Sequence, residues 1–253
     1  MPVLQNHLDR LNNQTAWITG GKRIGQTVAR TLAELGVNII ASYRLSESEA
    51  FETAAMARGL GVRAMAVRAD VSSYESIKAA VDRVKDEFPL IHILINMASV
   101  YQPVEIDSIT QEHWEESFSA HVLGTFWPTQ LIVPLMPPGA HIINIADITA
   151  IARIQRVNLP YVVTKAAVAS MTRAMALEYG SKGIFVNAVA PGPILPPEDF
   201  SKEKWQRIRD RSPVKYPVTD EEAVEQFALL VVYLSMTTMS SGQIYPVDQA
   251  HGL

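Results

Sequence analysis

Short apolar segments alternate with longer segments of helical period along most of the chain. Several of the short segments are apolar throughout, which is typical of strands covered by helices on both faces of a parallel sheet. The longer segments repeat their apolar positions every three to four residues, as amphipathic helices do. The pattern predicts strands at Thr15–Thr19, Asn38–Tyr43, Ala64–Ala69, Ile91–Ile95, His141–Ile145, Ile184–Ala190 and Gln243–Val247, and helices near 24–35, 47–58, 73–87, 110–135, 160–180 and 220–236.

The order of these elements predicts the fold class. Repeated strand–helix–strand units form right-handed crossovers, which place the strands parallel to one another in one sheet. We therefore expect an α/β fold with a doubly wound, Rossmann-type parallel sheet and helices on both faces. No linker or internal repeat interrupts the alternation, so we predict that residues 1–253 form a single domain.

Three helix starts carry the S/T-x-x-E pattern, in which a hydroxyl and a carboxylate cap the first free N–H groups of a helix. The predicted capping boxes are Ser46–Glu49, Ser72–Glu75 and Thr219–Glu222. These starts support the helices expected near residues 47, 73 and 220.

Composition excludes several classes of function. Hydrophobic residues make up 48% of the chain and charged residues 19%, which is enough for a sizeable core. The net charge of −4 offers no basic excess for nucleic acid or for an anionic membrane. The absence of cysteine excludes disulfides and thiolate chemistry, and no apolar run reaches the ~18 residues of a membrane span. We expect a cytoplasmic protein that binds neither nucleic acid nor membrane, and no metal site.

A glycine turn follows the first predicted strand and precedes a helix. Gly20, Gly21 and Gly25 would let the backbone approach a pyrophosphate, and the helix N-terminus would supply free N–H groups. The alternative is an ordinary strand–helix turn that happens to contain glycines. The order strand, glycine turn, helix favours a dinucleotide-binding site.

The end of the second predicted strand indicates which dinucleotide binds. NAD-selective folds place an acidic residue there to hold the ribose hydroxyls, whereas this chain has Tyr43-Arg44 with Ser46 nearby. A guanidinium suits a 2′-phosphate, and Lys22 or Arg23 could add a second cation. We therefore predict NADP (NADPH) as the cofactor, the alternative being that Arg44 is simply a solvent-exposed arginine.

Tyr161 and Lys165 stand four residues apart at the start of a predicted helix, and this spacing places both on one face. A nearby ammonium favours phenolate and would lower the pKa of the tyrosine, which suits a proton donor to a developing alkoxide or amide. We interpret the pair as catalytic.

Further motifs accompany the glycine turn and the Tyr161–Lys165 pair. They are Asp70-Val71, Asn96-Met97-Ala98-Ser99, the segment from Asn187 to Gly192, and Ser241-Gly242-Gln243 followed by Val247-Asp248. On these motifs the sequence resembles the short-chain dehydrogenase/reductase family, from Thr19 to Asp248. The resemblance implies a sheet of seven parallel strands, nicotinamide-dependent hydride transfer to or from a small-molecule substrate, and a homodimer or homotetramer.

The resemblance also implies a role for each matching residue. Tyr161 would donate the proton, and Lys165 would hold the cofactor ribose and tune Tyr161. Asp70 would contact the adenine, and the Pro191-Gly192 turn would lie beside the nicotinamide. The expected cofactor-binding residues are Gly20, Lys22, Arg23, Ile24, Gly25, Tyr43, Arg44, Ser46, Asp70, Val71, Asn96, Ala98, Ser99, Lys165, Pro191, Gly192 and Ile194.

Departures from the family pattern narrow the expected substrate. Asp147 stands where the family has a serine after the fifth strand, and Arg23 stands where most members have glycine. Together with Ser99 and Tyr101, these residues resemble the pteridine reductase branch, whose aspartate helps relay a proton to the pterin ring. The expected substrate-binding residues are Ser99, Tyr101, Asp147, Tyr161 and Pro193. Asp147 could instead only cap a loop, and Tyr101 could be an aromatic wall without substrate contact.

Other departures leave alternatives open. His121 stands where the family has a proton-relay asparagine, so it would either pass protons near neutral pH or pack without a catalytic duty. The glycine turn is one residue shorter than the family's. Beside the pteridine reductase hypothesis we therefore keep two others, a carbonyl or 3-oxoacyl reductase and a non-catalytic NADP-binding sensor.

The Pro-rich stretch from Pro191 to Pro197 is followed by a charged segment that ends at Lys215. Taken singly, its basic residues are typical of a solvated helix. The segment follows a late strand, and ligands of open α/β sheets bind at the carboxyl ends of the strands. We therefore predict a substrate lid around residues 193–217.

Overall fold

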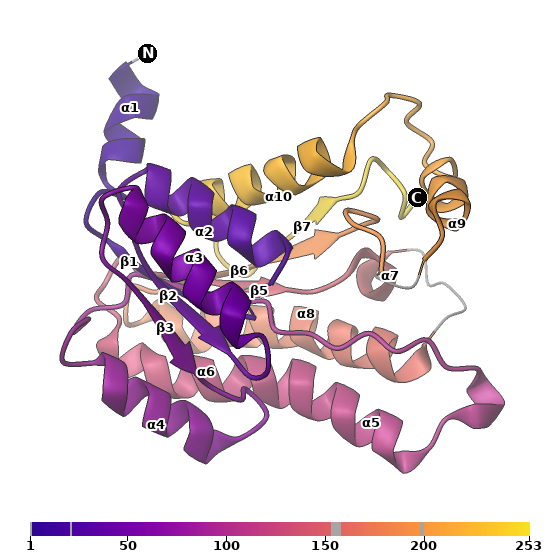
Figure 1. Cartoon of the computed structure of the whole chain (residues 1–253), viewed down its shortest axis with the longest axis horizontal. Helices are drawn as coiled ribbons and strands as arrows, with labels where there is room; N and C mark the ends of the chain where they lie inside the picture. The colour runs from indigo at the N-terminus through magenta and orange to yellow at the C-terminus, as the bar shows by residue number, and fades with distance from the viewer. Residues whose placement is uncertain (1, 21, 153–157, 198–199) are drawn as a thin grey trace.

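The computed structural model describes residues 2–20, 22–152, 158–197 and 200–253. They form one seven-stranded sheet, all parallel, in the order β3-β2-β1-β4-β5-β6-β7 (Figure 1). The strands are β1 (Thr15–Thr19), β2 (Asn38–Tyr43), β3 (Ala64–Arg68), β4 (Ile93–Asn96), β5 (His141–Ile145), β6 (Phe185–Pro191) and β7 (Ile244–Val247). The predicted fold class and all seven predicted strands are confirmed.

Helices cover both faces of the sheet. Helices α2, α3 and α10 pack on one face and α4, α6 and α8 on the other (Figure 1). The helices are α1 (Pro2–Asp9), α2 (Ile24–Glu34), α3 (Glu47–Gly59), α4 (Tyr74–Val84), α5 (Gln111–Ser117), α6 (Gly124–Ile132), α7 (Ile148–Ile151), α8 (Leu159–Gly180), α9 (Lys202–Arg209) and α10 (Asp220–Leu234). Short 3₁₀ turns lie at η1 (Ile106–Ser108) and η3 (Val133–Leu135).

The sheet is covered on both sides because its central strands are apolar on both faces. Every residue of β1, β2 and β4 is buried. Burying one Ile or Leu side chain stabilises the folded state by roughly 1.5–3 kcal/mol. The apolar contacts between the sheet and the two helix layers therefore hold the strand ends in place. Within the described residues, no helix is long and apolar enough to cross a membrane.

One long predicted helix is interrupted in the structure. The helix expected at 110–135 consists of α5, a π-helical segment η2 (Phe118–Leu123), α6 and η3. A π-helix costs helix stability and persists where side-chain contacts compensate, often at a functional site. His121 supplies such contacts, because its ring nitrogen Nδ1 lies 2.8 Å from Thr164 Oγ1 on α8. Periodicity alone gave no indication of this interruption, nor of the short helices α1 and α7.

The predicted helix caps have mixed outcomes. The Thr219–Glu222 capping box is confirmed. The box at Ser72–Glu75 is wrong, because Ser73 caps α4 while Ser72 donates a hydrogen bond to Asp70 Oδ1 at 2.6 Å. The box at Ser46–Glu49 is also wrong. Ser46 makes no capping hydrogen bond, and the Glu49 carboxylate instead lies 3.7 Å from the Lys22 ammonium.

Candidate active site

A groove of about 620 Å³ lies where the strand order reverses, at the carboxyl ends of β1 to β4. In a doubly wound sheet this is where a dinucleotide binds. The structure brings together many of the predicted cofactor residues along it, namely Gly20, Lys22, Arg23, Ile24, Tyr43, Arg44, Ser46, Asp70, Val71, Ala98 and Ser99. Gly21, in the same turn, lies outside the described residues.

The glycine turn leaves room for a close backbone approach. Gly20 has a φ of +72°, and a Cβ placed there would lie 2.8 Å from Ala98 Cα. Thr19 draws the two strand ends together, because its Oγ1 accepts the N–H groups of Met97 (3.1 Å) and Ala98 (3.3 Å). The helix α2 begins directly after the turn at Ile24, so the positive end of its dipole faces the groove. The N–H groups of Gly25 and Gln26 donate within the turn, to the carbonyl oxygens of Lys22 and Arg23. These features fit the pyrophosphate of a dinucleotide.

Arg23 combines an unusual backbone with a long-range contact. Its φ of 57° lies in the left-handed region that favours glycine, and such a position costs roughly 1–3 kcal/mol for another residue. Its guanidinium Nη2 donates to the Pro196 carbonyl oxygen at 2.5 Å. Arg23 therefore lines the groove and also joins the glycine turn to the 193–217 segment.

The groove carries a cation at the end of β2, where we expect the adenosine. Arg44 is exposed there and lines the groove with Tyr43 and Ser46. The Tyr43 hydroxyl donates to Glu47 Oε1 at 2.7 Å, and this hydrogen bond raises the pKa of the phenol. Asp70 is held by Ser72, whose N–H and hydroxyl both donate to Asp70 Oδ1.

Several predicted cofactor residues lie away from this groove. Asn96 is buried behind it, where its amide donates to Thr129 Oγ1 (3.0 Å) and Asn144 Oδ1 (2.9 Å). Ile194 is buried in an apolar cluster with Ala223 and Val224. Asn96 therefore does not line this groove, and its contact with the cofactor stays a prediction. Gly25, Lys165, Pro191 and Gly192 also do not line the groove.

A second cavity, of about 170 Å³, is lined by two of the predicted catalytic residues, Asp147 and Tyr161. It collects the predicted substrate residues Tyr101, Asp147, Tyr161 and Pro193, together with Pro191 and Gly192, while Ser99 lines the larger groove. Phe200, Trp205 and Ile208 also line the cavity and belong to the predicted lid segment, although none of them was named singly. Asn158 and His251 were not predicted. Asn158 had a local signal, because an Asn that precedes a Pro-containing helix start is a favoured N-cap.

Asp147 and Tyr161 form the centre of this cavity. The Tyr161 hydroxyl donates to Asp147 Oδ2 at 2.8 Å. Asp147 Oδ1 accepts the N–H and the hydroxyl of Thr149, at 2.8 and 2.6 Å, which fixes the carboxylate at the start of α7. Asp147 is therefore both a cap and a partner of Tyr161. Tyr101 packs edge-on against the Tyr161 ring, with ring centroids 5.0 Å apart.

Lys165 lies on the same face of α8 as Tyr161, as predicted. Its Nζ lies 5.8 Å above the Tyr161 ring and donates to the Ile145 carbonyl oxygen at 2.8 Å. Burial lowers the pKa of Lys165 to about 8. Burial also raises the pKa of Tyr161 well above its usual value, and the Asp147 carboxylate raises it further. The expectation that the lysine lowers the tyrosine pKa is therefore wrong, because burial and a carboxylate at 2.8 Å outweigh the more distant ammonium.

His121 connects the β4 loop to α8. Its Nε2 accepts the Val100 N–H at 3.2 Å and lies 3.0 Å from Ser99 Oγ, while Nδ1 faces Thr164. Nε2 also lies 3.1 Å from the Val100 carbonyl oxygen. Because the Thr164 hydroxyl donates its proton to the Pro160 carbonyl oxygen, it accepts from the ring, and we assign the proton of the neutral ring to Nδ1. Burial, and secondarily the Lys165 charge, lower the pKa of His121 to about 3. The ring therefore stays neutral near pH 7, and its two nitrogens connect the β4 loop to α8. Whether His121 also relays a proton stays a prediction.

Taken together, a dinucleotide groove at the switch point of a doubly wound sheet and a buried tyrosine–lysine pair define a nicotinamide-dependent oxidoreductase. Residues 20–249 match the family profile described as Enoyl-(Acyl carrier protein) reductase. The chain thus belongs to the short-chain dehydrogenase/reductase family.

Individual relatives agree with this assignment. The chain is 34% identical over 226 residues to the uncharacterized oxidoreductase YhdF of Bacillus subtilis (strain 168), covering 87% of this chain and 78% of that protein. It is 32% identical over 210 residues to the 3-oxoacyl-[acyl-carrier-protein] reductase FabG of Staphylococcus epidermidis, covering 81% and 84%. The crystal structure of a short chain dehydrogenase from Burkholderia cenocepacia J2315 in complex with NADP matches with a TM-score of 0.88 at 26% identity, covering 96% of this chain and 100% of that one. The names of these relatives support assignment to the short-chain dehydrogenase/reductase family, but none of them supports the pteridine reductase branch.

Proposed function

We propose that this enzyme is an NADPH-dependent reductase that acts on the C=N bond of a pteridine or a similar flat nitrogen heterocycle. The observation that carries the proposal is the carboxylate of Asp147, which lies in the substrate cavity and is bonded to the Tyr161 hydroxyl. The NADP of the Burkholderia relative and the exposed Arg44 in the groove support the cofactor.

Hydrogen-bond chemistry favours this substrate class. A ketone oxygen only accepts hydrogen bonds, and an ionised carboxylate only accepts them, so Asp147 offers a carbonyl substrate no donor. The N–H groups of an aminopyrimidine ring are donors and complement such a carboxylate. Tyr101 adds an aromatic face to the same cavity, and an offset aromatic stack is worth ~1 kcal/mol beyond the buried area.

Each residue of the site then has its own role in the reaction. When bound, the reduced nicotinamide supplies a hydride. Tyr161 stays protonated at neutral pH because its pKa is raised, so it is set to give a proton to the substrate nitrogen rather than to take one. Asp147 holds that hydroxyl in place, and Thr149 holds Asp147. Lys165 places a positive charge over the ring of Tyr161 and offsets the negative charge that develops on the tyrosine.

Steady-state assays with NADPH and 7,8-dihydrobiopterin or dihydrofolate test the proposal. We expect turnover that Tyr161→Phe abolishes. The matched control is Tyr179→Phe, near the carboxyl end of α8 and outside the cavity lining, which should leave turnover intact. Turnover of ketones or 3-oxo esters with none on any dihydropterin would overturn the proposal.

A carbonyl or 3-oxoacyl reductase is the second candidate, and the FabG relative favours it. Asp147→Ser separates the two. The change introduces a hydroxyl donor to an oxyanion, an effect worth a few kcal/mol in related chemistry. Under the leading proposal this variant loses pterin reduction, whereas a carbonyl reductase gains ketone reduction. A homodimer or homotetramer and the closing of the 193–217 segment as a lid remain predictions.

A further inference from the structure

Helix α9, in the predicted lid segment, has little apolar surface with which to attach to the body of the protein. Its sequence is KEKWQRIR, and Trp205 is its buried residue, with 9% of its surface exposed. Because apolar burial is the main force that holds a surface helix in place, the position of α9 depends on a few specific contacts.

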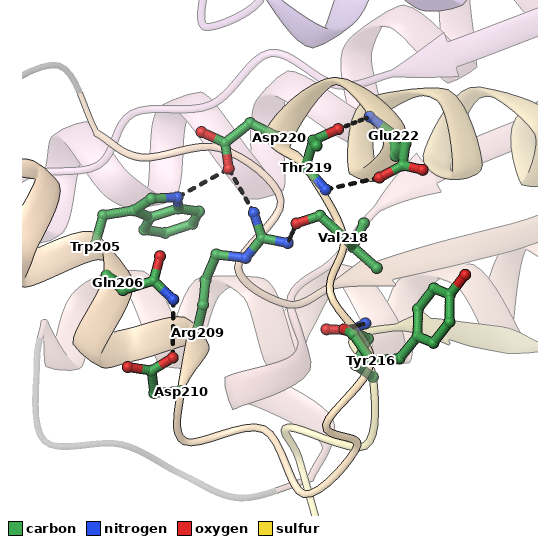
Figure 2. Close-up of polar contacts among 10 residues, drawn as sticks. Trp205, Gln206, Arg209, Asp210, Tyr216, Val218, Thr219, Asp220 and Glu222 are labelled. Carbon is green, nitrogen blue, oxygen red and sulfur yellow. Dashed lines mark hydrogen bonds and ion pairs between the residues drawn. The ribbon is translucent and has the colours of Figure 1, made fainter.

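Those contacts converge on one carboxylate oxygen. Asp220 Oδ1 accepts a hydrogen bond from Trp205 Nε1 at 2.9 Å and a second from Arg209 Nη1 at 2.7 Å (Figure 2). The other terminal nitrogen of Arg209 donates to the Val218 carbonyl oxygen (Figure 2). The two donors lie one turn apart on α9, so Asp220 fixes both the position and the rotation of that helix.

Asp220 itself stands on a rigid element. It is the first residue of α10, whose start is closed by the Thr219–Glu222 capping box (Figure 2). Further along, α10 buries Phe227 and Val231 in the core cluster under β1 and β2. A carboxylate in the first helical turn is also stabilised by the helix dipole. Asp220 therefore anchors α9 to the core of the fold, and we call its hydrogen bonds to Trp205 and Arg209 the Asp220 anchor.

The anchored indole reaches the substrate cavity. Trp205 lines that cavity together with Tyr101, Asp147 and Tyr161. The indole N–H of Trp205 therefore bonds to Asp220 at the start of α10, while the same side chain forms part of the cavity wall. A change at Asp220 would move a wall of the cavity without touching the Asp147–Tyr161 pair.

We propose that Asp220 is a positioning residue that sets substrate affinity by holding Trp205 against the cavity. This inference rests on the proposed function in one respect, since it takes the cavity as the substrate site. The cofactor groove lies at the ends of β1 to β4 and does not include Trp205 or Asp220. Loss of Asp220 therefore raises the substrate KM and leaves NADPH binding unchanged.

The first experiment needs no substrate. Amide hydrogen exchange across residues 202–209 is compared in the wild type, Asp220→Ala, Asp220→Asn and Glu221→Ala. The last is a matched control, because Glu221 is an exposed acid in the same helical turn. We expect faster exchange in α9 for Asp220→Ala, a smaller change for Asp220→Asn, which keeps an acceptor for the indole, and wild-type exchange for Glu221→Ala. Equal exchange rates in Asp220→Ala and Glu221→Ala would refute the inference that Asp220 anchors α9.

The second experiment measures KM, kcat and the NADPH Kd of the same variants with 7,8-dihydrobiopterin, or with ethyl acetoacetate if only the carbonyl substrate is turned over. We expect Asp220→Ala to raise KM about tenfold, the size of losing a hydrogen bond to a charged group, with kcat within about twofold and the Kd unchanged. In a Trp205→Phe background the further effect of Asp220→Ala on KM falls to about twofold.

The outcomes separate the two proposals. An unchanged KM, or a rise in KM matched by an equal rise in the NADPH Kd, overturns the positioning role. Activity on ethyl acetoacetate alone overturns the pteridine proposal while the KM comparison still decides the role of Asp220. If neither compound is turned over, acrylamide quenching of tryptophan emission decides it: an increase in Asp220→Ala that Trp205→Phe removes supports the role, and no increase refutes it.

Discussion

Replacing His121 by asparagine is expected to make the protein more resistant to acid. His121 is 1% exposed, and burial lowers its pKa from 6.5 to about 3. Between these two pKa values the unfolded chain binds a proton at this ring and the folded chain does not. Acid therefore favours unfolding, so the stability that depends on neutral His121 is fully present above pH 6.5 and is lost as the pH falls toward 3.

The size of the effect follows from the two pKa values. One pH unit below the ordinary pKa, the unfolded ring is about ten-elevenths protonated while the folded ring stays neutral. The resulting loss is about 1.4 kcal/mol between pH ~7.5 and pH ~5.5. An asparagine amide does not titrate in this range, so His121→Asn removes this part of the loss. His141, whose pKa burial lowers to about 4, still contributes a similar amount in both proteins.

Urea denaturation at the two pH values measures the effect. We expect the free energy of unfolding to fall by about 1.4 kcal/mol less in His121→Asn than in the wild type. His7→Asn, in the amino-terminal helix, is the control and keeps the wild-type difference. An identical pH dependence in wild type and His121→Asn would show that the buried ring titrates as in water. The neutral hydrogen-bonding role would then be refuted, and a relay through imidazolium would again be open.

Three further predictions concern the cofactor groove and Lys165. Gly20→Ala places a Cβ 2.8 Å from Ala98 Cα at a positive φ, so calorimetry should show NADPH binding weakened at least about tenfold. Gly59→Ala is the control and should leave NADPH binding unchanged, because no described atom lies within 4 Å of its added Cβ. Arg44→Asp should shift the preference from NADPH toward NADH by about tenfold or more in kcat/KM, and an unchanged ratio would refute the phosphate role. Because the pKa of Lys165 is lowered to about 8, kcat/KM should fall as the pH rises through that value, and a flat profile up to pH ~10 would contradict the assignment.

Parts of the site could be predicted because they depend on local order along the chain. Tyr161 and Lys165 lie on one helix, where a spacing of four residues determines a shared face. Gly20 and Arg44 follow two strands that neighbour each other in the sheet, so the parallel topology brings them to the same edge. Asn96 shows the limit of this reasoning, since its place at a strand end could be predicted but its hydrogen bonds to Thr129 and Asn144 could not.

The strand and helix order, the parallel sheet, the glycine turn and the tyrosine–lysine pair could be predicted from the sequence, because each follows from periodicity or short-range spacing. The way in which charges and hydrogen bonds meet across long separations became known only from the folded chain. Folding buried Tyr161 and placed the Asp147 carboxylate on its hydroxyl, and these two effects reversed the expected direction of the tyrosine pKa. It joined Arg23 to Pro196, which are 173 residues apart, and it fastened α9 to Asp220. Distances and burial set these interactions, and neither is encoded in the spacing of residues along the chain.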